Sequence, residues 1–266
     1  FFTISILPCA CRLSGGLFFC INSPMSEDKE EKKPTNEKDY AFKDDFTYKH
    51  DNPYHDKLGL FDEIVLRDDE GEGHRGNWSK DVFDNDHELH VEIGTGYGHF
   101  MIDYTQQNPG INFVGMDHRF KRSYNLARKL EKLEFKNFRY LRARGERLGH
   151  LFGEGEISKL FYFFPDPWPK KRHNKKRLFQ KTFLDIAHKA IKDGGELLVK
   201  TDHDGYFEWM LEELETETRF KKQMVTFDLK KEHPEHFLAS FETKFEKIFL
   251  EKGIKIKAMV LTNQKG

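Results

Sequence analysis

Residues 89–98 read LHVEIGTGYG, and this stretch sets the fold that we expect for most of the chain. The run Leu89–Ile93 predicts a strand, and the glycines after it predict a tight turn into a helix over 100–107. A second run, Ile111–Met116, ends at Asp117. From here to about residue 264, short apolar runs alternate with amphipathic segments. Because this alternation is typical of βα repeats, the sequence predicts a doubly wound α/β fold.

The remaining predicted elements continue the alternation. The run 157–164 is almost continuously apolar and aromatic, which suits a central strand covered on both faces. We expect a mostly parallel, seven-stranded sheet within a single domain over residues 57–266. Its other predicted strands cover 138–141, 196–201, 224–229 and 254–261, and its other helices cover 124–133, 178–192 and 207–214.

Composition limits what else the chain can hold. A chain of 266 residues with 37% hydrophobic residues can form one full α/β domain plus tails. All three cysteines lie in the first twenty residues, so we expect no disulfide or thiolate metal site in the body. The net charge is −1, so nucleic-acid binding would need a local basic patch. No stretch after the first 24 residues approaches the ~20 apolar residues that span a bilayer, which favours a cytoplasmic location.

The first 56 residues differ from the rest. Residues 1–24 contain two apolar runs but no initiator Met, and Gly15-Gly16 interrupts them. We interpret them as a non-native upstream extension before a start at Met25, with a poorly formed signal peptide as the alternative. Residues 25–56 are rich in charge, and we expect a disordered arm. Its aromatic residues offer a second possibility, docking on the catalytic domain.

The glycine turn after the first strand indicates a nucleotide cofactor. Glycines there let the backbone approach a ligand, and Asp117 lies where an acidic side chain typically accepts from ribose hydroxyls. The spacing of Gly94, Gly96 and Gly98 is not that of dinucleotide enzymes, and Glu92 adds a carboxylate. The pattern favours S-adenosylmethionine over NAD, while a turn without any ligand remains the alternative.

Residues 164–177, FPDPWPKKRHNKKR, place a carboxylate beside a cluster of cations. Pro165 and Pro167 restrict the backbone around Asp166, and we expect the residue before each proline to be extended. The cations that follow are the pattern expected where phosphates are held, although most charge runs are simply solvated. The stretch predicts an active-site edge next to a nucleic-acid contact.

At these residues the chain resembles the tRNA (guanine-N7)-methyltransferases, which have a Rossmann-like, S-adenosylmethionine-dependent fold. The resemblance rests on EIGTG at 92–96, GMD at 115–117, the block 163–177, KTD at 200–202 and TKFE at 243–246. It implies methyl transfer to N7 of a variable-loop guanine in tRNA, with Asp166 in the catalytic role. The implied cofactor contacts are Glu92, Gly94, Gly96, Asp117 and Asp166. The implied substrate contacts are Lys170, Asp202, Thr243, Lys244, Phe245 and Glu246, and the implied RNA contacts are Arg172, Lys175, Lys176 and Arg177.

Some of these residues have a plainer interpretation. Thr243 and Glu246 also fit a helix capping box, and Asp202 also fits a solvated strand end or a helix cap. The family usually has Asp or Asn before Ala after the third strand, but Arg144-Gly145 stands there. An Arg cannot accept a hydrogen bond from the adenine amino group, so either Glu146 substitutes for the missing residue or backbone groups alone hold the adenine. We expect weakened cofactor affinity.

Guanine N7 carries a lone pair and no proton, so its attack on a sulfonium methyl needs no general base. We therefore expect catalysis by positioning, with Asp166 stabilising the charge that develops on the purine. Eight histidines show no zinc-ligand spacing, and we expect no metal; they are His87, His90, His99, His118, His173, His203, His233 and His236. The rival functions are a noncatalytic tRNA-binding or scaffold protein and an NAD-dependent oxidoreductase, which would leave the block 164–177 unexplained. We infer no obligate protein partner and expect a monomer or homodimer.

Overall fold

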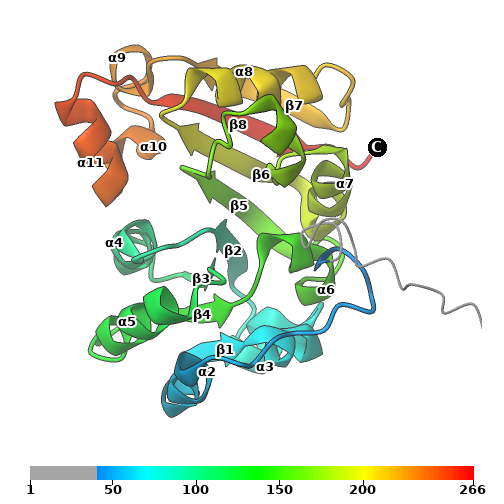
Figure 1. Ribbon diagram of the computed structural model, residues 1–266, viewed down its shortest axis with the longest axis vertical. Coiled ribbons are helices and arrows are strands. Elements are labelled where there is room, and N and C mark those ends of the chain that lie inside the picture. Colours follow the sequence, from blue (N-terminus) through cyan, green and yellow to red (C-terminus); the bar gives the residue numbers. More distant parts are fainter. Residues whose placement is uncertain (1–40) are drawn as a thin grey trace, which may run out of the picture. The chain divides into compact units, whose positions relative to one another are not determined.

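A computed structural model describes residues 41–266, which contain one eight-stranded sheet with helices on both faces (Figure 1). The strand order is β1-β4-β3-β2-β5-β6-β8-β7, and all neighbours up to β6 are parallel while β8 is antiparallel to both β6 and β7. The predicted doubly wound, mostly parallel fold is confirmed. The strands are β1 Val65–Arg67, β2 Glu88–Ile93, β3 Ile111–Met116, β4 Phe138–Arg142, β5 Ile157–Phe163, β6 Ile191–Thr201, β7 Phe220–Thr226 and β8 Lys257–Asn263.

The described sheet has one strand more than the seven predicted. The additional strand, β1, pairs with β4 through Val65, Leu66 and Arg67. Three residues next to a charged segment give too little periodicity to be recognised from sequence. The extra strand extends the sheet beyond β4 and brings the charged turn at Asp68 to its edge.

The helices divide into two groups, one for each face of the sheet. One buried cluster joins residues of α3, α6, α7 and α8, including Trp78, Phe183 and Phe207, to one face. The other joins α2, α4, α5 and α10 to the opposite face, around Phe100 and Phe161. The α-helices are α2 Pro53–Leu58, α3 Trp78–Phe83, α4 His99–Gln107, α5 Phe120–Leu130, α6 Leu148–Leu151, α7 Lys181–Ala190, α8 Asp204–Glu213, α9 Leu229–Glu232, α10 Phe237–Ser240 and α11 Lys244–Glu251. The 3-10 helices are η1 Gly59–Phe61, η2 Asp68–His74, η3 Gly145–Arg147 and η4 Lys171–Lys176.

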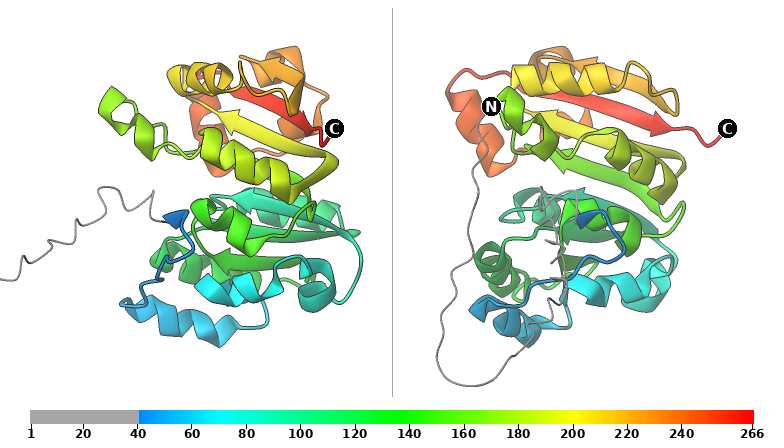
Figure 2. Two further views of the ribbon diagram at one scale, coloured as in Figure 1. Left: turned by 90° about the vertical axis from the view of Figure 1, so that its right-hand side faces the viewer. Right: turned by 45° about the vertical axis from the view of Figure 1, so that its right-hand side comes forward.

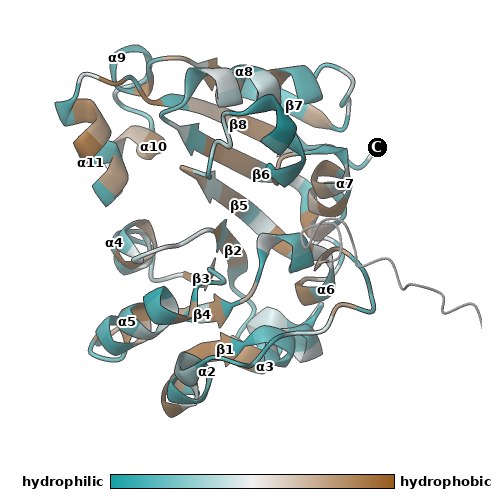
Figure 3. Ribbon diagram, viewed as in Figure 1, coloured by the Kyte–Doolittle hydropathy of each residue, from teal (hydrophilic) through white to brown (hydrophobic). Residues whose placement is uncertain are grey.

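Hydropathy follows these layers. Figure 3 shows β6 and β8 largely hydrophobic and α5 largely hydrophilic on its visible side. In β2 the side chains alternate, so that Leu89, Val91 and Ile93 join the first cluster while His90 contacts the aromatic rings of the second. Because both faces are covered, the strands read as nearly continuous apolar runs in the sequence.

The last three strands differ in their bounds from the prediction. β6 begins at Ile191, where the sequence suggested the end of a helix and a glycine turn. Gly194 has a φ of +71°, and the pairing of β5 with β6 shifts register in the same region. The two glycines therefore form an irregularity within a long strand. β7 and β8 are likewise displaced by a few residues from the predicted bounds, and β7 is a mostly exposed edge strand while β8 is buried between β6 and β7.

Within the predicted arm, residues from Ala41 onward contact the domain. Ala41 is buried, and the guanidinium of Arg147 donates to the carbonyl oxygens of Ala41 and Lys43. The Tyr48 hydroxyl donates to Glu72 at 2.6 Å, and Glu72 also pairs with Arg147. The predicted upstream extension, the cysteines and the first part of the arm lie outside the described residues. Over residues 41–266, no helix is both long and apolar enough to cross a membrane.

Candidate functional site

The turn between β2 and α4 is built around three glycines with left-handed backbone. Gly94, Gly96 and Gly98 have φ values of +86°, +61° and +71°. A Cβ on Gly98 would lie 2.5 Å from the Leu126 side chain, whereas one on Gly94 would meet no atom within 4 Å. The amides of Gly94 and Thr95 donate to the Met116 carbonyl oxygen, which holds the turn at the end of β3. The turn therefore leaves open space above Gly94.

Glu92 is a buried carboxylate without a complete set of partners. It lies at the end of β2 with 3% of its surface exposed, and its Oε2 atom has no hydrogen-bond partner among residues 41–266. Burial, reinforced by the nearby negative charge of Asp117, raises the pKa of Glu92 to about 8. Burial of an acceptor atom without a hydrogen-bond partner costs free energy unless a ligand donates a hydrogen bond to it. Glu92 thus fits a cationic or hydrogen-bond-donating group.

Asp117, at the end of β3, is buried and already held in place. Its carboxylate accepts from the Arg119 amide at 2.9 Å and pairs with the Arg122 guanidinium at 3.2 Å. The Arg122 guanidinium also lies over the Tyr97 ring, 5.4 Å from its centre. Sequence reasoning missed Arg122, which is the first basic side chain on the inner face of α5. Together with Glu92 and the glycine turn, Asp117 forms a site that fits a cofactor bearing both a cation and hydroxyl groups.

The loop after β5 does not have the backbone predicted for it. Phe164 and Trp168 each precede a proline, and their φ values are +46° and +45°. The expected extended geometry is therefore wrong at Phe164, the residue before Pro165. At both Phe164 and Trp168, left-handed backbone makes the sharp turns of the loop. Non-glycine residues rarely hold this conformation unless surrounding contacts impose it, and they cluster at functional sites.

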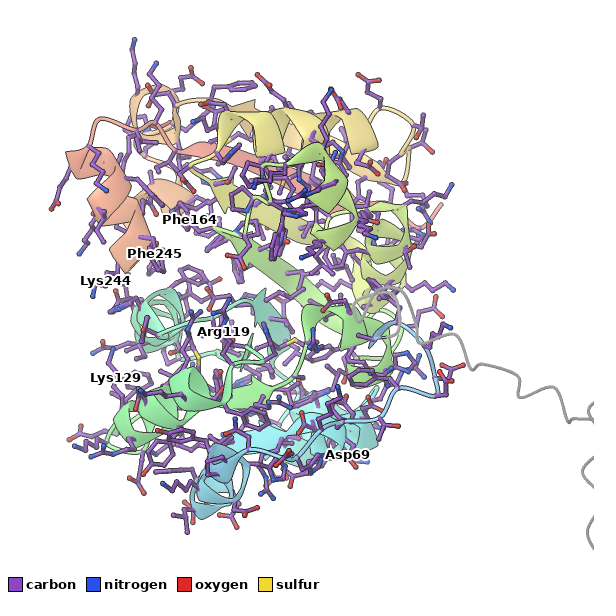
Figure 4. All side chains as sticks on the ribbon, in the orientation of Figure 1. Asp69, Arg119, Lys129, Phe164, Lys244 and Phe245 are labelled. Atoms are coloured by element: carbon purple, nitrogen blue, oxygen red, sulfur yellow. The ribbon has the colours of Figure 1, made fainter. Side chains whose placement is uncertain are left out.

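Asp166 lies at the tip of this loop with 70% of its side chain exposed. Its carboxylate lies 3.8 Å from the guanidinium of Arg119, whose backbone amide binds Asp117. Arg119 thus connects the loop after β5 with the carboxylate at the end of β3. Figure 4 shows Arg119 between the two halves of the sheet, on the same side as Phe164. The structure brings together Glu92, Asp117 and, through Arg119, Asp166.

Arg177 differs from the exposed cation that the sequence suggested. It is 5% exposed, and its guanidinium donates to the carbonyl oxygens of Pro167 at 3.0 Å and Trp168 at 3.4 Å. Its guanidinium also packs over the rings of Tyr206 and Trp209. Turned inward in this way, Arg177 supports the Asp166 loop and offers no charge to solvent.

We therefore expect effects of very different size on stability when two arginines five residues apart are replaced. Arg177→Ala should lower the free energy of unfolding by about 1.5–3 kcal/mol, because two carbonyl groups lose a charged donor. Arg172→Ala, at an exposed position, should change it by less than about 0.5 kcal/mol. Urea unfolding of both variants checks this. Equal losses would contradict the bracing role of Arg177.

The remaining cations of this block are solvent-facing. Lys170, Lys171, Arg172, Lys175 and Lys176 are exposed, and η4 carries most of them. Lys176 lies over the Trp168 ring, 4.6 Å from its centre. Figure 2 (left) shows the yellow-green segment that contains η4 extending away from the sheet. These charges therefore form a protruding basic surface, which we call the η4 surface.

Lys200 and Glu246 form a fully buried ion pair that the sequence did not reveal. The Lys200 ammonium also donates to the carbonyl oxygens of Leu238 at 2.9 Å and Phe241 at 3.0 Å. Burial lowers the pKa of Lys200 and raises that of Glu246, while their mutual attraction opposes both shifts. Glu246, expected to contact substrate, is instead turned into the protein. The pair fastens the start of α11 to β6.

Loss of this buried pair should lower the free energy of unfolding. Glu246→Gln keeps the shape but removes the charge, and we expect a loss of about 1.5–3 kcal/mol in the free energy of unfolding. Glu242→Gln is the matched control, because its pair with Lys230 is about one-third exposed and should contribute less than about 1 kcal/mol. Urea titration measures both. A control loss as large as that of Glu246→Gln would contradict the account.

The other predicted substrate residues lie at the same carboxyl edge of the sheet. Thr243 caps α11, accepting from the Glu246 amide at 3.1 Å, so the predicted capping role is confirmed for its hydroxyl. Lys244 and Phe245 are exposed at the start of α11, where Figure 4 shows them near Phe164. The Phe249 ring lies 6.0 Å from that of Phe164 and 6.5 Å from that of Phe245. Three rings therefore connect the Asp166 loop with α11.

Asp202 follows β6 and is half-buried. The helix after it is capped by the His203 side chain, which accepts from the Tyr206 amide, so the interpretation of Asp202 as a helix cap is wrong. Lys257 donates to the Asp202 carbonyl oxygen at 3.0 Å and holds this strand end. Arg144 is half-buried after β4, where its charge and that of Glu146 act on the pKa of His118, which burial lowers.

Comparison with known proteins agrees with this arrangement. Residues 86–259 match the protein family described as "Putative methyltransferase". A tRNA (guanine-N(7)-)-methyltransferase from Geobacillus sp. (strain WCH70) is 35% identical over 201 residues, covering 76% of this chain and 88% of that relative. The crystal structure of the 16S rRNA methyltransferase KamB superposes with a TM-score of 0.51 at 16% identity, covering 66% of this chain and 88% of that one, and supports the fold. The chain belongs to the tRNA (guanine-N(7)-)-methyltransferase family.

Proposed function

We propose that this protein transfers a methyl group from S-adenosylmethionine to N7 of a variable-loop guanine in tRNA. The observation that supports this best is the buried Glu92 carboxylate, whose Oε2 atom has no partner in residues 41–266 and which lies beside the glycine turn. S-adenosylmethionine carries a sulfonium and an ammonium group, so a carboxylate at that place would suit it.

The residues present fit that cofactor. Glu92 would accept from its cationic part, Asp117 would accept from its ribose hydroxyls, and Gly94 leaves room for close approach. When bound, S-adenosylmethionine supplies an electrophilic methyl group on a sulfonium centre. Asp117 can take the ribose only if Arg122 shares or releases it, since Arg122 occupies one carboxylate oxygen.

The protein groups would act by position and charge. Guanine N7 has a lone pair and no proton, so no side chain is needed to remove a proton before attack. Asp166, exposed at the loop tip, would face the purine and stabilise the positive charge that it gains. Orientation of the two reactants can lower the barrier by roughly 7–11 kcal/mol. The bracing of this loop by Arg177 is therefore part of the proposed mechanism.

The RNA would be held by two surfaces at the same edge of the sheet. The η4 surface would bind phosphates, and the exposed Phe245 ring, stacked with Phe249, would offer a platform for an unpaired base. Lys170 belongs to the η4 surface, and Asp202 would contact the substrate at the end of β6. Their roles, the cytoplasmic location and the monomeric or homodimeric state remain predictions.

Salt dependence of binding tests the RNA part of this proposal. Full-length protein should transfer label from S-adenosylmethionine to tRNA lacking the modification, and its affinity for tRNA should fall steeply with added salt. Lys175→Ala should reduce the slope of log affinity against log salt by about 0.7–0.9 without changing the binding of S-adenosylmethionine. Binding of tRNA without transfer would favour a scaffold instead, and a salt-independent affinity would contradict the phosphate contacts.

A further inference from the structure

A second cluster of chemically active side chains lies outside the proposed site. His50, His55 and Asp68 each offer one ligand atom, and the three atoms lie within 4.8 Å of one another. No other such group of histidine, cysteine or carboxylate residues occurs within 41–266. Figure 4 shows Asp69, the neighbour of Asp68, on the side of α2 and α3, far from Phe164 and Phe245.

Asp68 is held as a buried acceptor pointing at the two histidines. It is completely buried, and its Oδ2 atom has no hydrogen-bond partner in the described chain. Its Oδ1 atom is bound by the Arg142 guanidinium, which in turn lies 3.7 Å from the centre of the Phe120 ring. The guanidinium fixes the orientation of the carboxylate and leaves the other oxygen available. Such a second contact is typical of carboxylates that bind metals.

The distances suit a metal ion better than direct pairing. The Nε2 atoms of His50 and His55 each lie 3.7 Å from Asp68 Oδ2, beyond the ~2.7–3.2 Å of a hydrogen bond. Two ligand atoms about 2.0–2.1 Å from a tetrahedral zinc ion are themselves about 3.3–3.4 Å apart. The two spacings from histidine to Asp68 are therefore only a few tenths of an ångström wider than a bound ion would require, and the two histidine nitrogens lie within 4.8 Å of each other.

The surroundings leave a position for a fourth ligand. The His50 side chain is 46% exposed, so water can reach the cluster from that side. His55 is 12% exposed and packs against Phe120. The two imidazole rings lie 4.1 Å apart. Two imidazoles and one carboxylate are ligands that zinc prefers.

We propose that His50, His55 and Asp68 bind a zinc ion that fastens the segment before α2 to the edge of the sheet. His50 lies in that segment, His55 lies in α2, and Asp68 follows β1. The ion would bridge elements that are otherwise joined by side-chain packing and by a hydrogen bond from Arg67 to the His55 carbonyl oxygen. The proposed role is structural, so the earlier expectation that methyl transfer needs no metal is unchanged.

Metal titration of the chelator-treated, full-length protein tests this proposal. We expect Zn²⁺ to raise the midpoint of thermal unfolding, and one equivalent of Co²⁺ to give visible absorption without intense thiolate charge-transfer bands. His50→Ala and His55→Ala should each abolish both effects. His87→Ala, an exposed histidine on the same protein, should retain them. Replacement of Cys9, Cys11 and Cys20 by Ser should also retain them.

His50 is exposed, so its substitution should leave the fold intact, as unchanged circular dichroism would verify. Asp68→Asn is a second variant that removes the carboxylate while keeping the fold. Asn tolerates the left-handed backbone at this position, where φ is +51°. The proposal is overturned if wild type shows neither effect, if the effects persist in His50→Ala and His55→Ala, or if they vanish in the cysteine variant.

Discussion

Glu92→Gln should weaken the binding of S-adenosylmethionine by roughly 30-fold to more than 1000-fold, the cost of removing one member of a buried charge pair. The substitution keeps the size of the side chain and removes only its charge. Calorimetric titration measures the effect. Glu88→Gln is the matched control, because Glu88 begins the same strand but is 56% exposed. Unchanged affinity in Glu92→Gln would contradict the role of this carboxylate.

The pH dependence of the same binding follows from the pKa of Glu92. Burial raises this pKa to about 8, so at neutral pH the free protein holds a proton that a cationic ligand would expel. Affinity should therefore rise between about pH 6 and pH 8, by up to tenfold per pH unit, and level off above that. Titrations in buffers of different ionisation enthalpy would detect the released proton. Glu92→Gln should lose this part of the pH dependence.

Stability without the cofactor should change in the opposite direction. The folded-state pKa of Glu92 is raised above the ~4.3 of an unfolded chain, so the folded protein binds the extra proton between these values. The stabilisation that this proton gives the folded state is complete below the pKa of Glu92 in the unfolded chain. It is lost as pH rises through the folded-state pKa of about 8. Cofactor-free Glu92→Gln should thus become more stable than wild type as pH approaches 8, although it binds the cofactor poorly.

Asp166→Ala should lower kcat by about 100-fold to 1000-fold, the range for loss of one electrostatic group at a reaction centre. Because Asp166 is exposed, its loss should leave the unfolding midpoint nearly unchanged. Single-turnover rates at saturating tRNA and S-adenosylmethionine separate this effect from binding. Asp166→Asn, which keeps the shape, should fall nearly as far because the charge is what acts.

Asp202→Ala provides the comparison for Asp166. Asp202 lies at the end of the neighbouring strand and does not cap α8. If it accepts from the guanine edge, its loss should raise KM more than it lowers kcat. Normal kinetics in Asp202→Ala would remove it from the site, and normal kinetics in Asp166→Ala would remove the proposed electrostatic contribution.

Much of the fold could be predicted because it depends on local patterns. The glycine turn and the runs that form β2, β3 and β5 identify themselves by periodicity and by residues that tolerate left-handed backbone. β1 and the long β6 were missed or misplaced. A three-residue strand has no period to detect, and two glycines look the same in a loop and in a strand irregularity.

The site was predicted less completely, because side-chain direction depends on distant contacts. Arg177 reads as one more cation in a basic run, and only the structure turns it toward Pro167 and Trp168. Glu246 reads as an exposed capping residue until Lys200 from another element reaches it. His50 and His55 have four residues between them, a spacing found in zinc sites, but no sequence pattern connects them with Asp68, which chain folding brings beside them. Long-range pairs of this kind leave no periodic signal.

The most direct test of the central claim is to identify the atom that receives the methyl group. Full-length protein would be incubated with S-adenosylmethionine and unmodified tRNA, and the digested nucleosides would be separated and identified by mass spectrometry against standards. We predict 7-methylguanosine at one position in the variable loop, with none formed by Asp166→Ala on the same time scale. Methylation at guanine N1 or N2 or at a ribose hydroxyl, or no product at all, would contradict the account.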